Sequence, residues 1–444
     1  MLYATVFTLF CAACTVLAFT RHPIWGFYFY LATTFVYPQG KWWGYQFGDL
    51  RWALVSAVVT AAAIILHSGK LKDKPLWLGN GPAALLVVYC AWMWLQTPLA
   101  LVRADHITGA TYFAKSLVAF WFVYRIVDSK ERVRDLLLAH VLGCAVLGLQ
   151  SLLVGRQGER LDGVGGPGID DANTLGMYLA TGLIAAAGLI LTQKGWRRWL
   201  SLGSIGAIAN GLVLVNSRGS MLGLVAGVLV LVLCKADKHR RVFWGLGVVT
   251  FAMGAIVVDE AFMERMLTIS QVTTEEADMS AQSRVELAKS QLQMFLDHPI
   301  GVGHRGTPAL SRDYLDDRWL SIDLRRRLDP AQRSSHNTFL TALVEQGVFG
   351  AMLYLALVLW IVGATWRAWR WRGSPADPEL ATFGATVCAA LAVVIVAGNT
   401  ADYLLVEVQF WLLAMLVSVR QLVPANATVL RRDEAGANVR RVGV

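Results

Sequence analysis

Apolar runs of about the length that crosses a bilayer recur along almost the entire chain, and they constrain its fold more than any other feature. About 20 helical residues cross the roughly 30 Å hydrocarbon core of a membrane. The candidate spans are 2–20, 24–37, 51–67, 81–102, 109–127, 135–154, 173–192, 199–215, 219–234, 242–258, 337–363, 380–397 and 403–420. The second run is short, and counting it as a re-entrant or paired segment leaves about twelve spans. Only 16% of the 444 residues are charged, against about 25% in soluble domains. The sequence therefore predicts an all-α polytopic membrane protein.

Basic residues collect in alternate short loops between these runs and indicate an orientation. The loops that share this feature are 70–74, 130–134, 194–198, 235–241 and 367–372. All fall on one side, which the positive-inside rule makes cytoplasmic. The net charge of +9 then reflects membrane orientation, and we expect no nucleic-acid binding. No basic leader precedes the first apolar stretch, so we interpret residues 1–20 as a retained span and not as a signal peptide.

The opposite side, expected to be periplasmic, receives the longest polar segment. The predicted parts are ten candidate spans in 1–258, a periplasmic loop in 259–335, the C-terminal spans in 336–423 and a cytoplasmic tail in 424–444. Within the loop, Ser283 to Glu286 has the S-x-x-E form of a capping box. The apolar residues that then share one helical face, up to Pro299, are Val285, Ala288, Leu292, Phe295 and Leu296. We expect an amphipathic helix that lies over the membrane domain or along its surface.

His336 directly precedes an apolar span, at the expected N-terminus of a helix. Backbone N–H groups at such an end disfavour a protonated imidazole, so the ring stays neutral and can accept a proton. The position therefore predicts a general base. The plainer alternative is an interfacial histidine that only caps the helix.

Two arginines on the outer side are candidate anion ligands. Arg218 lies in a very short turn between two apolar spans, where the positive-inside rule gives it no benefit. Arg284 falls in the first turn of the predicted amphipathic helix, where a cation opposes the helix dipole. A fixed anion clamp explains both positions. The alternatives are snorkelling to lipid phosphate for Arg218 and a solvated helix start for Arg284.

Lys115 interrupts an apolar span about two turns below the outer surface. A charge at mid-bilayer costs about 2.5–3.5 kcal/mol, so this side chain should face the bundle interior or a wet cavity. Glu407, which follows Asp402 at the last span, is a candidate partner. A purely structural ion pair is the alternative to a functional role.

The remaining motifs give weaker signals. The glycine-rich loop 161–173 ends at Asn173 and offers backbone N–H groups to an anion, although most such loops are only turns. The G-x-G-x-x-G at 301–306 belongs to no βαβ unit and does not indicate a dinucleotide site. The acidic pairs lack a histidine at ligand spacing, and the six cysteines lie in or beside apolar runs. We expect no metal site, no cofactor and no disulfide framework.

Three ordered pieces of the sequence resemble the O-antigen ligase and polymerase superfamily. They are NSRGSMLGL at 216–224, SRVELAKSQLQMFLDHPIGVG at 283–303 and HNTFLTALVEQGVFG at 336–350, preceded by GPGIDDANTLGMYLA at 166–180. The resemblance is best over 170–350. It implies a multi-pass glycosyltransferase of the GT-C type in the bacterial inner membrane, with a periplasmic active site. Unlike many metal-dependent enzymes of that type, this chain has no acidic pair in its first outer loop, where only Asp49 stands.

The resemblance also implies roles for individual residues. His336 matches the family's essential histidine, and Arg218 and Arg284 match its two essential arginines. The ligase branch works without a metal ion and transfers an undecaprenyl-diphosphate-linked O-antigen glycan, with inversion, to a sugar hydroxyl of lipid A-core. His336 is then expected to accept the acceptor proton, while the arginines hold the diphosphate. Further candidates for the same substrate-binding pocket are Lys115, Asn173 and Asp402.

Other functions remain open from the sequence. An O-antigen polymerase uses the same donor with a second lipid-linked glycan as acceptor, and a protein O-oligosaccharyltransferase of the same superfamily transfers the glycan to protein. A lipid or solute transporter is a more distant alternative, for which inverted repeats and helix breaks near the bilayer midplane are expected. The polar candidates here gather at one face instead.

Overall fold

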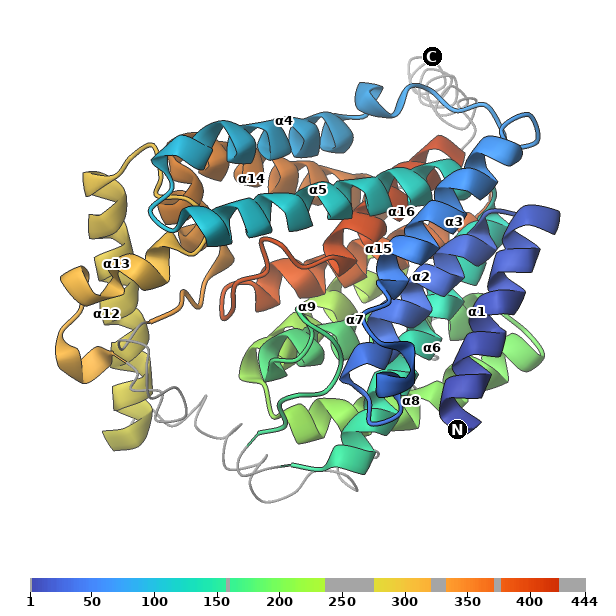
Figure 1. The fold of residues 1–444 in the computed structure, drawn as a ribbon, viewed down its shortest axis with the longest axis horizontal. Helices are drawn as coiled ribbons and strands as arrows, with labels where there is room; N and C mark the ends of the chain where they lie inside the picture. The colour runs from blue at the N-terminus through green and yellow to red at the C-terminus, as the bar shows by residue number, and fades with distance from the viewer. Residues whose placement is uncertain (1, 157–159, 236–274, 321–332, 371–376, 423–444) are drawn as a thin grey trace, which may run out of the picture.

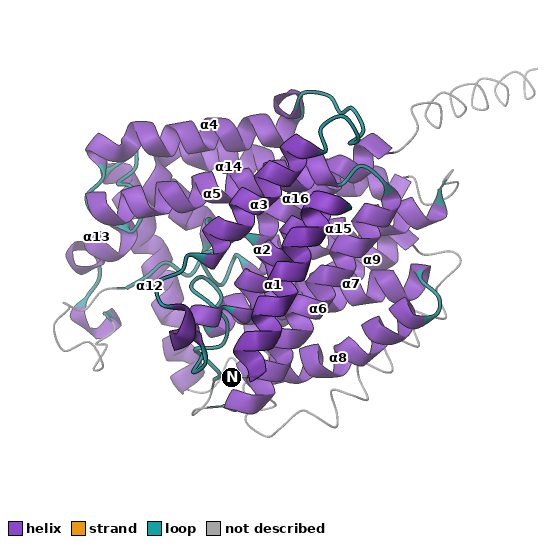
Figure 2. Ribbon diagram, turned by 45° about the vertical axis from the view of Figure 1, so that its right-hand side comes forward, coloured by secondary structure: helices purple, strands orange, loops and turns teal. Residues whose placement is uncertain are grey.

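The computed structural model describes residues 2–156, 160–235, 275–320, 333–370 and 377–422. Within these ranges the chain forms helices and connecting loops, with no β-strand (Figure 2). Seven of the helices are long and apolar enough to cross a membrane, and three shorter ones are also apolar. The predicted all-α polytopic membrane fold is confirmed.

The helices follow the predicted spans closely. In the N-terminal half they are α1 (Leu2–Thr20), α2 (Ile24–Val36), α3 (Trp52–Leu66), α4 (Gly81–Gln96), α5 (Arg103–Ile126), α6 (Lys130–Val154), α7 (Ala172–Thr192), α8 (Trp196–Val215) and α9 (Arg218–Lys235). The later helices are α12 (Glu275–Asp297), α13 (Gly306–Tyr314), α14 (Thr338–Arg370), α15 (Pro378–Ala397) and α16 (Val408–Leu422). The predicted span 242–258 lies outside the described residues. With 13 residues, α2 is about 20 Å long, which is too short to cross the bilayer core alone.

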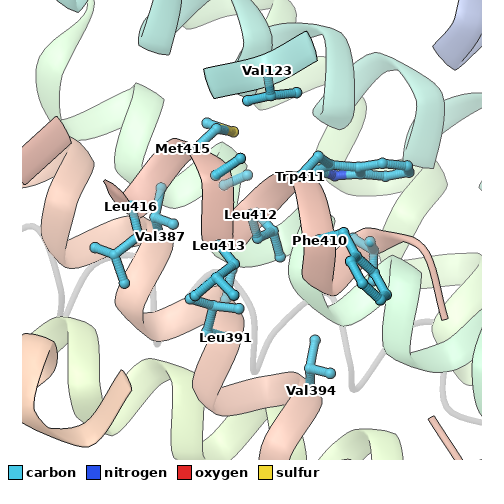
Figure 3. Packing of buried hydrophobic residues seen from close by; sticks show 14 of the residues in the cluster. Val123, Val387, Leu391, Val394, Phe410, Trp411, Leu412, Leu413, Met415 and Leu416 are labelled. Atoms are coloured by element: carbon cyan, nitrogen blue, oxygen red, sulfur yellow. The ribbon is translucent and has the colours of Figure 1, made fainter. Parts of the chain in front are cut away.

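The last helix forms the centre of the packed core. Almost every side chain of α16 is buried, from Val408 to Val419, as expected for a helix that is apolar all round. Figure 3 shows its residues Phe410 to Leu416 between Val123 of α5 and the α15 side chains Val387, Leu391 and Val394. This packing fixes the segment 398–407, which joins α15 to α16 and leads to the candidate site.

Several of the basic loops are tied together on one side of the bundle. Lys130 Nζ lies 3.1 Å from a carboxylate oxygen of Asp377, and Gln193 donates a hydrogen bond to Glu379 at 2.8 Å. Lys74 donates to the carbonyl of Val127 at the end of α5. The loops that carry these residues therefore share one side, as their alternation along the sequence predicts. The assignment of that side to the cytoplasm remains a prediction.

The outer half of α14 is separated from the rest of that helix by a break at Gly347, whose φ is 67°. The loop 299–303 repairs the break, because Val302 and Gly303 donate backbone hydrogen bonds to the carbonyls of Val344 and Glu345, at 3.1 and 2.8 Å. A Cβ atom at Gly347 would lie 2.2 Å from the carbonyl carbon of Ile300. The glycines of this motif thus bring two backbones together, and they anchor α12 and α13 to α14 at one end of the molecule (Figure 1).

The predicted start of the amphipathic helix is wrong. α12 begins at Glu275, so Ser283 lies inside the helix and caps nothing. Three residues of the predicted apolar face are exposed: Val285 (53%), Leu292 (49%) and Leu296 (68%). The buried side chains of α12 are Leu287, Ser290, Gln291 and Met294. Polar Gln291 is buried because it donates a hydrogen bond to the hydroxyl of Ser335, at 2.9 Å.

Candidate functional site

Three helices begin beside one another on the outer side of the bundle, and each has a polar N-cap. Asp171 accepts the backbone N–H groups of Asn173 and Thr174 at the start of α7. Asn337 accepts those of Phe339 and Leu340 at the start of α14. The start of α9 uses the hydroxyl of Ser217, which accepts the N–H of Ser220 at 3.4 Å. Such caps satisfy the free N–H groups of a helix end and fix its position.

The segment 398–403 joins these three helix starts. Thr338 of α14 donates its N–H to the carbonyl of Gly398, at 2.7 Å. Tyr403 donates its hydroxyl to the carbonyl of Asn173 on α7, at 2.8 Å. The start of α9 packs so closely that a Cβ atom at Gly219 would overlap the Thr400 hydroxyl, at 1.7 Å. In Figure 1 this segment lies at the centre of the molecule, next to α9. Because each helix N-terminus carries partial positive charge, their convergence favours an anion here.

Asn173 links the helix starts to an arginine that the sequence analysis missed. Its side-chain oxygen accepts hydrogen bonds from Arg160 Nη2 at 2.7 Å and from the Ser217 hydroxyl at 3.0 Å. Ser217 immediately precedes Arg218. The preceding turn is also held, because Arg156 donates to the carbonyls of Val213 and Leu214. Asn173 thus joins Arg160 to Ser217, the residue before Arg218.

His336 stands one residue before the Asn337 cap and is half-buried. Burial, together with the positive charges of Arg333, Arg284 and Arg160, lowers the pKa of its imidazole to about 4. The ring is therefore neutral at pH 7, as expected for a general base, although burial and three arginines, not the helix end alone, are the cause. These influences also place Arg284 and Arg160 near His336.

Arg284 and Arg218 are positioned by different elements. α12, which carries Arg284, is attached to the segment before His336 by the Gln291–Ser335 hydrogen bond. Arg284 lies well inside α12, so its position no longer opposes the helix dipole. Arg218 is half-buried as the first residue of α9. Its neighbour Gly219 contacts Thr400, two residues from the carbonyl that binds the start of α14.

Lys115 and Asp402 lie beside other groups. The Lys115 ammonium lies over the ring of Tyr112, 5.1 Å from its centroid. Its charge also acts on Glu407, its predicted partner. The charges of Glu345, His304 and Arg305 act on the Asp402 carboxylate. Asn173 thus bonds directly to Arg160, whereas the arginine nearest to Asp402 in this sense is Arg305.

The glycine-rich loop uses its backbone donors within the protein. The N–H of Ala172 binds Asp162 at 2.8 Å, and the next two N–H groups bind Asp171. This arrangement favours the turn interpretation over an anion cradle. Among the described residues, no group of three or more His, Cys, Asp or Glu side chains is arranged to hold a metal ion.

Some of the missed residues had a usable signal. Arg156 and Arg160 lie in the outer loop 155–172, where the positive-inside rule gives an arginine no benefit, which is the reasoning that singled out Arg218. The same reasoning applies to Arg333. Tyr403 and Ser217 had no such signal, because a buried hydroxyl is recognised only through its partners.

The comparison with protein families agrees with this geometry. The family model described as O-antigen ligase matches residues 202–355. That range runs from α8 into α14 and includes Arg218, Arg284 and His336. No curated protein matches the chain. The resemblance drawn from the sequence motifs is confirmed over residues 202–355, where the chain matches the O-antigen ligase family model.

Proposed function

We propose that this protein is an O-antigen ligase, which transfers a glycan from undecaprenyl diphosphate to a sugar hydroxyl of lipid A-core on the periplasmic side of the inner membrane. The observation that carries the proposal is a neutral imidazole, His336, surrounded by arginines where three helix N-termini converge. This combination offers a proton acceptor next to positive charge, as transfer from a diphosphate leaving group requires.

The cationic side of the site would hold the donor diphosphate. Arg218 and Arg284 are assigned to its phosphate oxygens, because guanidinium groups bind such oxygens in a bidentate manner. Arg160, fixed by Asn173, is assigned to the same role. Since these charges belong to the protein, negative charge that develops on the leaving diphosphate is stabilised without a metal ion.

The reaction is a single displacement at the anomeric carbon of the donor sugar. The acceptor hydroxyl oxygen forms the new bond to that carbon while its proton passes to a ring nitrogen of His336. The bond between the carbon and the diphosphate oxygen breaks, and its electron pair leaves with undecaprenyl diphosphate. Attack from the face opposite the leaving group inverts the configuration.

The bound donor itself would improve His336 as a base. In the absence of donor, nearby guanidinium groups help to keep the imidazole pKa near 4. A diphosphate brings negative charge that offsets them, which raises the affinity of the ring for a proton. Proton transfer is therefore strongest when the donor is in place.

Purified protein tests the proposal directly. A lipid-diphosphate glycan is incubated with lipid A-core, or with a second copy of the donor lipid, with and without EDTA. We expect one glycan to be transferred to lipid A-core, and the yield to be unaffected by EDTA. A ladder of products on the second lipid would indicate a polymerase instead. Solute uptake into liposomes without any glycan product would indicate a transporter.

A further inference from the structure

A second group of titratable side chains lies beside the 398–407 segment. Asp402 and Tyr403 are consecutive in an irregular stretch. Tyr403 reaches Asn173, which binds Arg160. The charges of His304, Arg305 and Glu345 act on Asp402. Asp402 therefore belongs to a group of side chains that contains a second carboxylate, Glu345.

Glu345 and His304 form a fixed pair in this second group. His304 Nδ1 lies 3.2 Å from a carboxylate oxygen of Glu345, whose side chain is only 3% exposed. The imidazole packs against α5, where a Cβ atom at Gly109 would lie 2.4 Å from the ring. The backbone N–H of His304 donates to His106 Nδ1 at 2.9 Å. A buried carboxylate bound to one ring nitrogen fixes the tautomer, and it leaves the other nitrogen to serve a ligand.

Asp402 is accessible and has an acceptor available. Its side chain is accessible to water, yet protein surrounds it closely enough that burial, together with the charge of Glu345, raises the pKa of its carboxyl to about 7. One carboxylate oxygen accepts the N–H of Leu404 at 3.0 Å. The other has no hydrogen bond to any residue in the described parts of the chain.

Buried polar atoms without partners lie close to the same carboxylates. The hydroxyl of Tyr89, on a side chain 4% exposed, has no hydrogen-bond partner among the described residues, and the charges of Asp402 and Glu345 act on it. Gln96 Oε1 also lacks a partner there, although Gln96 Nε2 donates to the Glu345 carbonyl at 2.9 Å. Unsatisfied buried groups are rare in native proteins and indicate a missing water or ligand.

We propose that Asp402 and His304, positioned by Glu345, line a subsite that binds the hydroxyl groups of the acceptor sugar. This inference rests on the proposed glycosyl transfer. Carboxylate and imidazole groups bind hydroxyls well, because a sugar hydroxyl both donates and accepts hydrogen bonds. The carboxylates of Asp402 and Glu345 disfavour a diphosphate at this position, since like charges repel. The two substrates are thus distinguished by charge.

The subsite is close enough to His336 for one sugar to reach both. The Thr338 hydroxyl bonds to Ala401 and Tyr403, the two neighbours of Asp402, at 2.9 Å each. His336 lies two residues before Thr338, a chain distance of at most about 7 Å. An acceptor held at Asp402 can therefore present another hydroxyl to the base.

Steady-state transfer by the full-length protein separates the two subsites. The acceptor is whichever of lipid A-core and the second donor lipid receives glycan from the wild type. We expect Asp402→Asn and His304→Gln each to raise the KM for acceptor about 10- to 100-fold, since each loses hydrogen bonds that involve a charged group. The KM for donor and the thermal unfolding midpoint should stay near the wild-type values.

The matched control is Asp105→Asn. Asp105 is an exposed carboxylate on the outer end of α5, 4.0 Å from Arg305 Nε, and its loss should leave both KM values unchanged. Two results would overturn the proposed subsite, provided that the wild type transfers glycan. One is an unchanged KM for acceptor in both test variants, and the other is an equal rise in the KM for donor. Absence of transfer to either acceptor would instead overturn the proposed function, and the subsite with it.

Glu345→Gln tests whether Glu345 positions the subsite or only stabilises the fold. The charged and titratable groups that face Asp402 are Glu345 and Tyr354 of α14, His304 and Arg305 of the preceding loop, and Tyr89 of α4. Removing the negative charge of Glu345 lowers the pKa of Asp402. The pH at which acceptor KM improves should therefore move below its wild-type position near 7. A lower unfolding midpoint with an unmoved pH dependence would refute the positioning role.

Discussion

The cations on the two sides of the bundle have different neighbours. On the side with the short basic loops, Lys130 lies within 3.1 Å of Asp377 and 3.5 Å of Glu379, and Arg134 lies 2.8 Å from Asp135. On the outer side, Arg160, Arg284 and Arg333 act together on His336 and lower its pKa.

The difference favours the outer side as the functional side. Carboxylates of the protein lie beside Lys130 and Arg134, so these two cations organise loops. The outer cations create a positive potential strong enough to resist protonation of a neighbouring imidazole. A bound anion is the counterion that such a potential favours. Each prediction below tests this contrast.

The largest loss of turnover is expected when the general base, His336, is removed. His336→Ala removes the group that accepts the acceptor proton, so turnover should fall about 10²- to 10⁴-fold. The KM for donor should change little, because the arginines remain. Steady-state transfer with both substrates varied separates the two quantities. Wild-type turnover in this variant would leave His336 as a helix-end histidine without a catalytic role.

The two family arginines should come next. Loss of a preorganised donor to a developing negative charge typically costs about 10²- to 10³-fold in rate, so Arg218→Ala and Arg284→Ala should each lower turnover by that factor. Lysine at either position keeps the charge but not the bidentate geometry, and it should restore turnover only in part. Turnover and donor binding retained in the double alanine variant would favour snorkelling to lipid phosphate.

A smaller effect is expected at Arg160. This residue reaches the site from a loop, held by the Asn173 side chain at 2.7 Å, and it is assigned to ground-state binding of the diphosphate. Arg160→Gln should raise the KM for donor about tenfold with little loss of turnover, as for one charge-assisted hydrogen bond. A fall in turnover at constant KM would place Arg160 in the transition state instead.

The pH dependence of transfer tests the positive potential around His336 while every cation stays in place. His336 must be neutral to act, and with its pKa near 4 it is neutral above that pH in the free enzyme. The acid limb of kcat/KM for donor, which reports free enzyme, should therefore lie near pH 4. Bound diphosphate raises the pKa, so the acid limb of kcat should lie at higher pH. The measurement is made in the Asp402→Asn variant, because this substitution removes the carboxyl whose pKa is about 7. Coincident limbs would contradict an anion beside the imidazole.

Much of the fold could be predicted because it depends on local sequence. Span length follows from hydrophobic thickness, and the helix starts carry recognisable caps such as Asn337. The start of α12 could not be predicted in this way. The S-x-x-E pattern at Ser283 satisfies the local rule equally well inside a helix, and tertiary contact buries polar Gln291 in place of apolar Leu292.

A residue of the candidate site could be predicted where its residue type is energetically unfavourable at its position in the membrane topology. An arginine such as Arg218 on the outer side requires an explanation, and so did Arg160, to which the rule was not applied. The division of the site could not be predicted. Asp402 and Tyr403 are adjacent in sequence but have different neighbours, and no local pattern indicates that Tyr403 binds Asn173 while the charges of His304 and Glu345 act on Asp402. The Glu345–His304 pair depends on the break at Gly347 and on the loop that repairs it, and such a long-range contact has no local pattern.

The smallest effect is expected on the inner side, and it serves as the reference for the others. Lys130→Gln removes a surface cation whose partners are Asp377 and Glu379. Exposed ion pairs contribute little to stability, so turnover should stay within about twofold of wild type and the unfolding midpoint should fall only slightly. Transfer assays and thermal unfolding of the purified protein measure both. If Lys130→Gln impaired donor binding as strongly as Arg160→Gln, the effect would arise from overall charge and not from the geometry around His336. The distinction between cations that organise loops and cations that form the site would then fail.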